Sequence, residues 1–434
     1  MSGQSQSGTD EFSLGYRYYM VFMLALMSML CTIDRSLVSV LAEPIKQEFG
    51  LSDTQLGLLT GLVFAVSYSV AGIPVGLMLD RYNRTRVVSL LLAIWSALTA
   101  FSGLVTSWIA LILARAGVGA AESGASPAAV SLIADYFPKE KRGSAMGIFY
   151  SNTPIGTMIG FGVGGLLAAA LGWRSVFFIF GIPGILLALL IVASVREPRR
   201  GQYDGHDPEA AADRYRLKDA FAALVRVRPL LWLMLGSVSV ILAMAGLSAF
   251  MTPFMIRVHG MSVDEAGFLV AIIKGPTGII GIVLGGFFAD WLTRRSSASA
   301  MRGCALLVSI ATPLALVGLF AESWFVTALF FAGYNFFNYT YYGATFATYM
   351  TFAPVRMRGA LSSILLIATN LVGYGVGPTM AGTLSDVFGS FGFADPLRWS
   401  LGVVGLFFAV AALCFARGSV HIARIERSPA PAAA

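Results

Sequence analysis

The stretch GLMLDRYNR at residues 76–84 returns later in the chain as GFFADWLTR at residues 286–294. Both copies read G-x-x-x-D-x-x-x-R, and each stands at the end of a long apolar stretch. One such match can arise by chance, whereas several matches in the same order indicate an internal duplication. The order of the other motifs therefore decides whether the chain consists of two related halves.

Two more pairs of motifs occur in that same order. PKEKRG at 138–143 matches PVRMRG at 354–359, and each opens an apolar stretch. Within these stretches, the glycines of GTMIGFGVGG at 156–165 match those of GYGVGPTMAG at 373–382. Three matches in register predict two parallel copies of one unit. Small residues at four-residue spacing let helix backbones approach closely, so we expect these glycine stretches at the interface between the halves.

The composition predicts that lipid surrounds most of the chain. The 434 residues have a mean hydropathy of +0.75 and only 12% charged residues, which is more apolar surface than one soluble core can hide. Apolar stretches of about 20 residues must be helical in hydrocarbon, and the chain has roughly twelve. We expect an all-α membrane protein whose twelve transmembrane helices form a six-plus-six parallel duplication. The expected spans are 16–41, 54–79, 86–106, 108–136, 143–170, 174–195, 229–256, 263–290, 303–320, 323–353, 359–385 and 398–416.

The basic residues predict the orientation of these spans. Of the 30 Lys and Arg residues, 23 fall on the side of both termini and three fall within spans. The remaining four, on the opposite side, are Lys46, Arg174, Arg257 and Arg398. Because positive loops stay in the cytoplasm, both termini should be cytoplasmic. The net charge of +7 therefore does not indicate a nucleic-acid partner.

The expected domains are a first six-helix bundle at 1–195, a linker at 196–228, and a second bundle with the tail at 229–434. The linker carries Arg196, Arg199, Arg200, Arg214, Arg216 and Lys218. A solvated, charged linker is the simpler interpretation, and contact with lipid headgroups is the alternative.

Several classes of site have no support in the sequence. The three cysteines and three histidines show no spacing for a metal or a disulfide framework, so we expect no cofactor. The polar start, residues 2–10, lacks the features of a signal peptide, so the first span should remain in the mature protein. A membrane enzyme or sensor is disfavoured because there is no triad-like cluster and no appended soluble domain.

Five charged residues lie well inside the expected spans, away from their ends. They are Asp34 and Arg35 in the first span, Arg115 and Glu122 in the fourth, and Lys274 in the eighth. A charge within a span costs at least a few kcal/mol unless it is paired or faces water, so each is a candidate functional residue.

Their depths predict an acid–base layer. Asp34 and Arg115 each lie seven residues from the same end of their spans, and so at about the same depth. Glu122 lies two turns further along the same helix face. A nearby guanidinium lowers the proton affinity of a carboxylate, so a substrate anion that competes for Arg115 or Arg35 would let Asp34 or Glu122 bind a proton. Permanent ion pairs that only fix helix register are the alternative, and Lys274 can instead satisfy carbonyls at the kink made by Pro276.

On these motifs, and on Arg115-x-x-x-Gly119, the chain resembles the major facilitator superfamily over nearly its whole length. Asn83 stands where the loop motif usually has glycine, and Phe161 stands where the fifth-span motif usually has proline. The resemblance implies alternating access, and a central cavity lined by spans 1, 4, 7 and 10. The expected coupling ion is the proton, and the expected oligomeric state is a monomer in a bacterial inner membrane.

The resemblance also implies a gate on the cytoplasmic side that stabilises the outward-open state. Its predicted residues are Asp80, Arg81, Arg84, Asp135, Asp290 and Arg294. The two aspartates that end spans 2 and 8 can cap a neighbouring helix, and Arg84 can pair with Asp135. The alternative is a purely topological role for the positive charge.

Within the superfamily, the chain is most similar to the Spinster branch of lysophospholipid and sphingoid-phosphate transporters. The similarity lies in TIDR at 32–35 and in the stretch from Arg115 to Pro138. It implies an amphiphilic substrate, which suits the aromatic residues of span 10 and the methionines of span 7, although most of these can equally be packing residues. The anion–cation symporter branch shares the same charge pattern, so a sugar-acid or carboxylate symporter with protons is the alternative.

Overall fold

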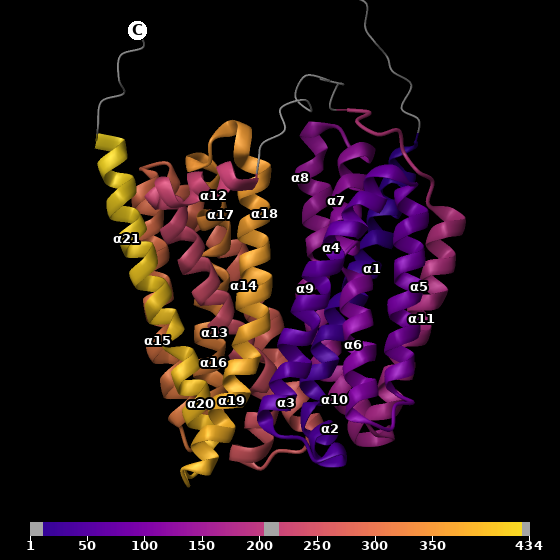
Figure 1. The fold of residues 1–434 in the computed structure, drawn as a ribbon, viewed down its shortest axis with the longest axis vertical. Helices are drawn as coiled ribbons and strands as arrows, with labels where there is room; N and C mark the ends of the chain where they lie inside the picture. Colours follow the sequence, from indigo (N-terminus) through magenta and orange to yellow (C-terminus); the bar gives the residue numbers. More distant parts are fainter. Residues whose placement is uncertain (1–11, 204–216, 428–434) are drawn as a thin grey trace, which may run out of the picture.

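The computed structural model describes residues 12–203 and 217–427, and within these ranges the chain is helical with no strand. Helices from the first part of the chain form one group, and helices from the later part form a second group beside it (Figure 1). The side chains of residues 217, 218, 289, 290 and 355 lie outside the described part. Two side-by-side helical groups are the arrangement that the repeated motifs predict.

The first group contains six spans and one short connecting helix. Three of these spans, the second, fourth and fifth, are made of more than one helical segment. The segments are α1 (Leu14–Val40), α2 (Ala42–Phe49), α3 (Asp53–Gly57), η1 (Leu58–Leu62), α4 (Val63–Arg81), α5 (Arg84–Ser102), α6 (Trp108–Glu122), α7 (Ala125–Tyr136), α8 (Lys139–Tyr150), α9 (Asn152–Met158), η2 (Ile159–Val163), α10 (Gly164–Leu171) and α11 (Trp173–Ser194).

The second group repeats this plan. Its segments are α12 (Leu217–Arg226), α13 (Arg228–His259), α14 (Val263–Thr293), α15 (Ser297–Phe320), α16 (Trp324–Tyr339), α17 (Tyr342–Phe352), η4 (Val355–Met357), α18 (Arg358–Ala368), η5 (Thr369–Val376), α19 (Gly377–Ser390), α20 (Pro396–Gly405) and α21 (Phe407–Arg427).

The number of spans confirms the predicted twelve. Ten continuous helical stretches in the described ranges are long and apolar enough to cross a membrane. The other two spans are the fourth and the tenth, and each is broken in its second half, at Ser123–Gly124 and at Thr340–Tyr341. Equivalent breaks in equivalent spans are a further sign of the duplication, together with the π-helical segments η2 and η5 in spans 5 and 11.

Two features of the helices differ from the predictions. The apolar pattern predicts that the last span ends at 416, but α21 continues to Arg427 because a helix can run past its apolar segment into the charged residues that follow. The linker contains a helix, α12, whose Ala220 and Leu224 are buried and which packs on α13 and α18. The many charged residues of the linker conceal this short apolar face.

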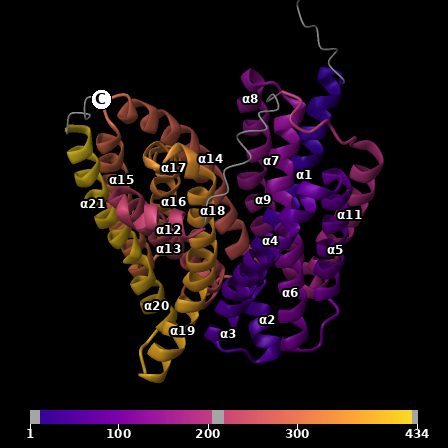
Figure 2. The same ribbon diagram turned by 45° about the horizontal axis from the view of Figure 1, so that its top comes forward.

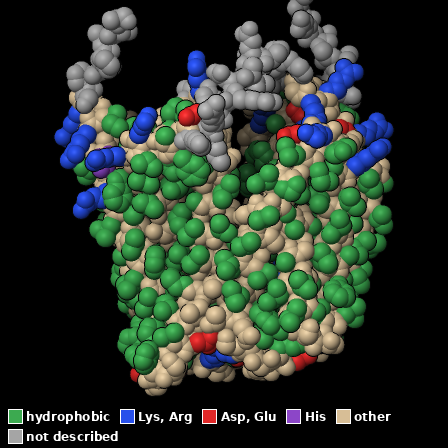
Figure 3. Space-filling model, viewed as in Figure 1, with side chains coloured by type: hydrophobic (Ala, Val, Ile, Leu, Met, Phe, Trp, Pro, Cys, Tyr) green, Lys and Arg blue, Asp and Glu red, His purple; other side chains and the backbone are tan. Residues whose placement is uncertain are grey.

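The two ends of the bundle differ in charge. The described chain begins at Phe12 and ends at Arg427 on one end, which we call the terminal face, and the opposite end is the far face (Figure 1). Lys and Arg side chains gather at the terminal face, whereas hydrophobic side chains cover the middle (Figure 3). This distribution is the one expected of a protein that spans a bilayer.

The two groups meet most closely at the far face, where α3 lies beside α19 in both views (Figure 2) and α2 packs on α13. Toward the terminal face the groups diverge, and Figure 3 shows a hollow between them. Spans 5 and 11 line this interface, as predicted, because α10 packs on α14 and α19 packs on α3. A Cβ built on Gly165 would lie 3.0 Å from the carbonyl oxygen of Val263, so glycine permits the close approach.

Candidate functional site

The first charge cluster lies inside the first group of helices. Arg115 on α6 donates from Nη2 to Asp34 Oδ2 on α1 over 2.6 Å, which is the predicted acid–base pair. Thr99 on α5 donates to the other oxygen, Asp34 Oδ1, over 2.7 Å. The two charged side chains are only 5% and 2% exposed. Three helices thus hold one ion pair away from water.

Arg115 has donors to spare. Its Nε and Nη1 atoms are buried and have no hydrogen-bond partner within the described residues. Because the side chain is buried, these donors do not face the central cavity. In this conformation Arg115 can act on a substrate only through Asp34 or after a rearrangement.

A second pair lies next to the first. Arg35 donates to Glu122 Oε2 from Nε and Nη2, each over 2.9 Å. Its guanidinium also lies over the ring of Phe64, at 4.6 Å, and that of Tyr68, at 5.3 Å. The Arg35 side chain is 43% exposed, whereas Glu122 is fully buried and its Oε1 has no partner within the described residues. Arg35 is therefore the one exposed side chain among the five charged residues predicted within the spans. The sequence placed both residues in the site but did not predict this pairing.

Lys274 on α14 is the candidate from the second group. It is buried, and its ammonium donates to the hydroxyl of Ser248 on α13 rather than to a carbonyl at the Pro276 kink. The same ammonium lies 5.0 Å from the ring centroid of Phe161 in η2, across the interface. Lys274 thus joins the two groups through a cation–π contact, which is stronger when both partners are desolvated.

The predicted gating residues at the terminal face are only partly brought together. Arg84 pairs with Asp135 over 2.5 Å, as predicted, and also with Glu197 over 2.6 Å. Arg200 donates to the last carbonyls of α4, including that of Asp80. All of these contacts stay within the first group of helices and its adjoining linker.

The other gating candidates make no such contacts. The side chains of Asp80, Arg81 and Arg294 have no polar partner in the described part of the chain, and the two arginines are exposed. The side chain of Asp290 lies outside the described residues. A gate formed by this set therefore remains a prediction about another conformation.

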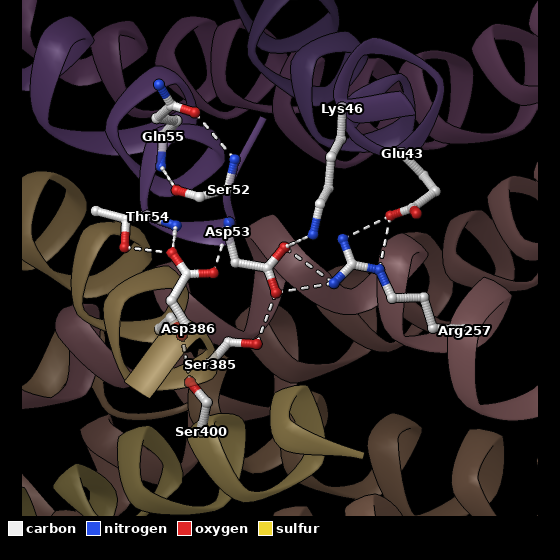
Figure 4. Close-up of polar contacts among 11 residues, drawn as sticks. Glu43, Lys46, Ser52, Asp53, Thr54, Gln55, Arg257, Ser385, Asp386 and Ser400 are labelled. Atoms are coloured by element: carbon white, nitrogen blue, oxygen red, sulfur yellow. Dashed lines mark hydrogen bonds and ion pairs between the residues drawn. The ribbon is translucent and has the colours of Figure 1, made fainter. Parts of the chain in front are cut away.

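A third cluster, at the far face, joins the two groups of helices (Figure 4). Asp53, which begins α3, accepts from Lys46 on α2 over 2.5 Å and from Ser385 on α19 over 2.6 Å. Arg257 on α13 donates from Nη1 to both oxygens of Asp53 over 2.9 Å, and from Nε to Glu43 over 2.8 Å. Glu43, Lys46 and Asp53 belong to the first group, whereas Arg257 and Ser385 belong to the second.

Asp386 on α19 completes this far-face network by capping a helix of the other group. It accepts from the backbone N–H groups of Asp53 and Thr54 over 3.0 and 2.8 Å, and from the Thr54 hydroxyl over 2.6 Å. The Ser52 hydroxyl accepts from the N–H of Gln55 in a capping box. The free donors of the first turn of span 2 are thus satisfied from both groups.

Close backbone contact accompanies these bonds. A Cβ built on Gly61 would lie 2.7 Å from the carbonyl oxygen of Gly375, and one built on Gly382 would collide with the backbone of Asp53. Sequence reasoning missed this network. A signal was present, because Lys46 and Arg257 are two of only four basic residues on that side and Asp53 stands just before a span.

Helix α2 is fixed to its own group by a separate set of bonds. Glu48 accepts from Trp173 Nε1 over 2.6 Å and from Arg174 Nη2 over 2.5 Å. The Arg174 guanidinium bound to it holds the pKa of the Glu48 carboxyl below its usual value. These bonds anchor α2, which also carries Glu43 and Lys46, within the first group.

Two helical groups that surround a cavity, with buried ion pairs in one group and an ion network that closes one face, define a membrane transporter. The family model of the Major Facilitator Superfamily matches residues 24–378. The chain therefore belongs to the major facilitator superfamily, whose members are transporters rather than enzymes.

Several individual members of the superfamily are similar to this chain. An MFS-type efflux pump of Mycolicibacterium smegmatis is 30% identical over 407 residues, 93% of each chain. The probable galactarate/D-glucarate transporter GudP of Escherichia coli is 27% identical and covers 99% of both chains. The crystal structure of a bacterial homolog to the human lysosomal transporter Spinster, inward-facing and unoccupied, has a TM-score of 0.85 and 31% identity, and covers 96% of this chain and 100% of that one. The chain is thus similar to Spinster transporters.

Proposed function

We propose that this protein is a proton-coupled secondary transporter that moves a single-chain amphiphile with an anionic or zwitterionic headgroup by alternating access. The observation that carries the proposal is the asymmetry of the cavity. The first group offers a cation held against a buried acid, whereas the second group offers aromatic and aliphatic side chains. A headgroup and an acyl chain need these two kinds of wall.

The headgroup would bind at Arg35. Its guanidinium is exposed to the cavity, is held by Glu122 and lies over two aromatic rings. A planar guanidinium can offer parallel donors to a phosphate or carboxylate. Lys274 would add a second positive charge from the other group of helices when its contact with Phe161 opens.

The acyl chain would lie against the second group. A pocket between α13, the broken tenth span and the eleventh span is mostly apolar, with a few hydroxyl groups. It is lined by Ser237, Ile241, Tyr341, Tyr342, Thr345, Phe346, Leu365, Leu366 and Thr369. With a free volume of about 20 Å³ the pocket is too small for an acyl chain in this conformation, so the acyl chain would lie along this apolar wall, against which a sugar acid has no apolar group to place. The similarity to the Spinster homolog supports the same choice.

Protons would couple through Asp34 and Glu122. A substrate anion that takes over the donors of Arg35 leaves Glu122 buried without its counter-ion, so the carboxyl must take up a proton. When the substrate leaves, Arg35 returns and expels the proton. Asp34 and Arg115 form the equivalent acid–base pair one layer away, and Asp34 directly precedes Arg35 on α1.

The charge distribution supports an orientation. With the basic terminal face in the cytoplasm of a bacterial inner membrane, the structure is closed to the outside and open inward. The bacterial Spinster homolog was crystallised in an inward-facing conformation. In the opposite state, we expect Asp80 and Asp290, with Arg81 and Arg294, to close the terminal face across the pair of Arg84 and Asp135. A monomer contains all of these parts.

A proton symporter of sugar acids is the alternative. GudP, which is similar over 99% of both chains, is described as a probable galactarate/D-glucarate transporter. The charge pairs of the first group suit either substrate, and only the apolar pocket separates them.

Transport in proteoliposomes tests both proposals. Purified protein would be supplied with a fluorescent lysophospholipid or with labelled glucarate, with and without an imposed pH gradient. We expect lysophospholipid transport that accelerates with the gradient. Gradient-driven glucarate transport without lysophospholipid transport would establish the alternative, and lysophospholipid transport that ignores the gradient would remove the proton from the proposal.

A further inference from the structure

We propose that Asp34 exchanges its proton with a water molecule held in a small chamber between spans 1, 3 and 6, and not with the central cavity. This inference rests on the proposed role of Asp34 in proton coupling. It adds a water-binding site and assigns Thr99 and Ser96 as positioning residues for proton transfer.

The chamber lies on the side of Asp34 that faces α5 and α11. It is lined by Leu30, Asp34, Trp95, Ser96, Thr99 and Phe180. Its free volume has room for about one water molecule. The remaining walls are apolar, so a water molecule there would have Asp34 and two hydroxyl groups as its polar neighbours.

The polar neighbours suit one water. Buried waters make about three hydrogen bonds to groups that would otherwise lack partners. Asp34 Oδ1 has only the Thr99 hydroxyl as a partner among the described residues, over 2.7 Å, and that hydroxyl keeps its own lone pairs free. The Ser96 hydroxyl also lines the chamber. Three oxygens thus converge on the chamber.

The cavity side of Asp34 is closed by charge and by packing. Arg115 covers Oδ2, and its side chain is only 2% exposed. The other titratable groups near Asp34 are Arg35 and Cys31 on its own helix and Glu122 on α6, whereas α5 and α11 present only hydroxyl and aromatic groups to the chamber. The uncharged chamber is therefore the open side of this carboxylate.

The proton transfer is simple in this geometry. A proton that enters through the open side of the chamber makes its water a hydronium ion, which gives a proton to Oδ1 and remains as water. In the reverse step the carboxyl O–H returns the proton to this water, and the proton leaves by the same side. The Thr99 hydroxyl fixes the orientation of the carboxylate, and Ser96 fixes the water. Neither step needs the substrate to leave the central cavity.

Glycines of span 6 make the chamber testable. Gly181 and Gly184 on α11 allow this helix to lie directly against α5. A Cβ built on Gly184 would lie 2.9 Å from Ser96 Cβ and still closer to the Ser96 hydroxyl oxygen. Gly184→Ala would therefore displace the Ser96 hydroxyl that lines the chamber, and the nearest neighbours of the new methyl group do not include Asp34 or Arg115.

Infrared spectroscopy of the full-length protein in lipid nanodiscs reads this site directly. The carboxyl stretch of protonated Asp34 is the band lost in Asp34→Asn, and its shift in D₂O follows exchange. We expect Gly184→Ala and Thr99→Val to slow this exchange by about a hundredfold, the lower end of what one positioned proton-transfer group contributes. Ser102→Ala is the matched control, because Ser102 is on the same helix but donates to Leu98.

The outcomes distinguish failure of the water chamber from failure of the proton-coupling role of Asp34. Unchanged exchange in Thr99→Val, which keeps the shape of the side chain, overturns the chamber and leaves the proton-coupling role of Asp34 intact. The chamber is also overturned if Ser102→Ala slows exchange as much as Gly184→Ala. If Asp34→Asn removes no band and leaves the pH dependence of transport unchanged, both the proposed function and this inference fail.

Discussion

The buried pairs in the first group of helices and the far-face network use the same residue types in opposite ways. Arg115 and Asp34 both belong to the first group, so they stay together however the two groups move. Arg257 and Asp53 belong to different groups, so their bond must break when the far face opens. One cluster is built to persist through the cycle, and the other is built to be exchanged.

Exposure to water explains why the far-face bonds can break during the cycle and the buried pair cannot. The Arg257 side chain is 23% exposed, so its charge regains water as soon as the groups separate. Breaking such a partly exposed pair costs little, whereas a fully buried charge that loses its partner has nothing to replace it. The contrast predicts that truncating a side chain of the buried pair damages the fold, whereas substitutions in the far-face network shift the conformational equilibrium.

The largest expected effect is on stability. Arg115→Ala leaves Asp34 buried without its counter-ion and should lower the free energy of unfolding by about 3–5 kcal/mol. Arg398→Ala removes a looser pair with the exposed Asp395 and should cost less than about 1 kcal/mol. Thermal unfolding in detergent compares the two. Equal losses of stability in the two variants would contradict the contrast between buried and exposed pairs. In the double variant Arg115→Leu with Asp34→Asn, neither side chain is charged, so most of the stability should return.

The next effect concerns coupling. Asp34→Asn and Glu122→Gln keep side-chain shape but cannot exchange a proton, so gradient-driven uptake of lysophospholipid should fall by roughly a hundredfold in each. Counterflow exchange without a gradient should continue, which shows that the protein is folded. Wild-type pH dependence of transport in both variants would remove these carboxylates from the coupling step.

A smaller effect separates the two arginines. Arg35 is exposed and Arg115 is buried, so Arg35→Lys should weaken lysophospholipid binding about tenfold through lost parallel donors and stacking. Arg115→Lys should change affinity by less than about threefold, or about 0.7 kcal/mol. The measurement is the lysophospholipid affinity of the wild type and of both variants at one pH. A larger loss in Arg115→Lys would place Arg115 in the binding site instead.

The smallest effect is at the terminal face. Asp80 has no side-chain partner among the described residues in this conformation, so Asp80→Asn should weaken only the opposite state, by up to about 1 kcal/mol. Spin-label distances across the terminal face should shift toward the open population. A shift toward the closed population would show that Asp80 does not hold this gate.

These contrasts also show what the sequence could predict. Charges within apolar spans, and their distance from span ends, were enough to predict that Asp34 and Arg115 meet, because helix geometry fixes depth. The repeated motifs were enough to predict two parallel halves and the pairing of Arg84 with Asp135. These features depend on local geometry within one half.

The rest depends on how the helices and the two halves dock. The pairing of Arg35 with Glu122 depends on the rotation of α1 against α6, which sequence spacing does not define. The far-face network depends on one conformation, since Asp386 meets the N–H groups of Asp53 and Thr54 only when the halves close there. No pattern within either half shows that such a partner exists.

Paired distance measurements test alternating access between the two clusters most directly. One pair of spin labels would report the far face, at Gln47 and Ser390, and another the terminal face, at Ser144 and Ser363, in a variant with the three buried cysteines replaced. Arg257→Ala and Asp386→Asn remove bonds that only the closed far face makes. Glu48→Gln is the control, since its bonds stay within the first group.

We expect both gate variants to lengthen the far-face distance and shorten the terminal-face distance together, while Glu48→Gln changes neither. Such a reciprocal change means that one rigid motion closes one face as it opens the other. A far-face distance that lengthens while the terminal face stays open, or no change in either distance, would contradict alternating access between these clusters.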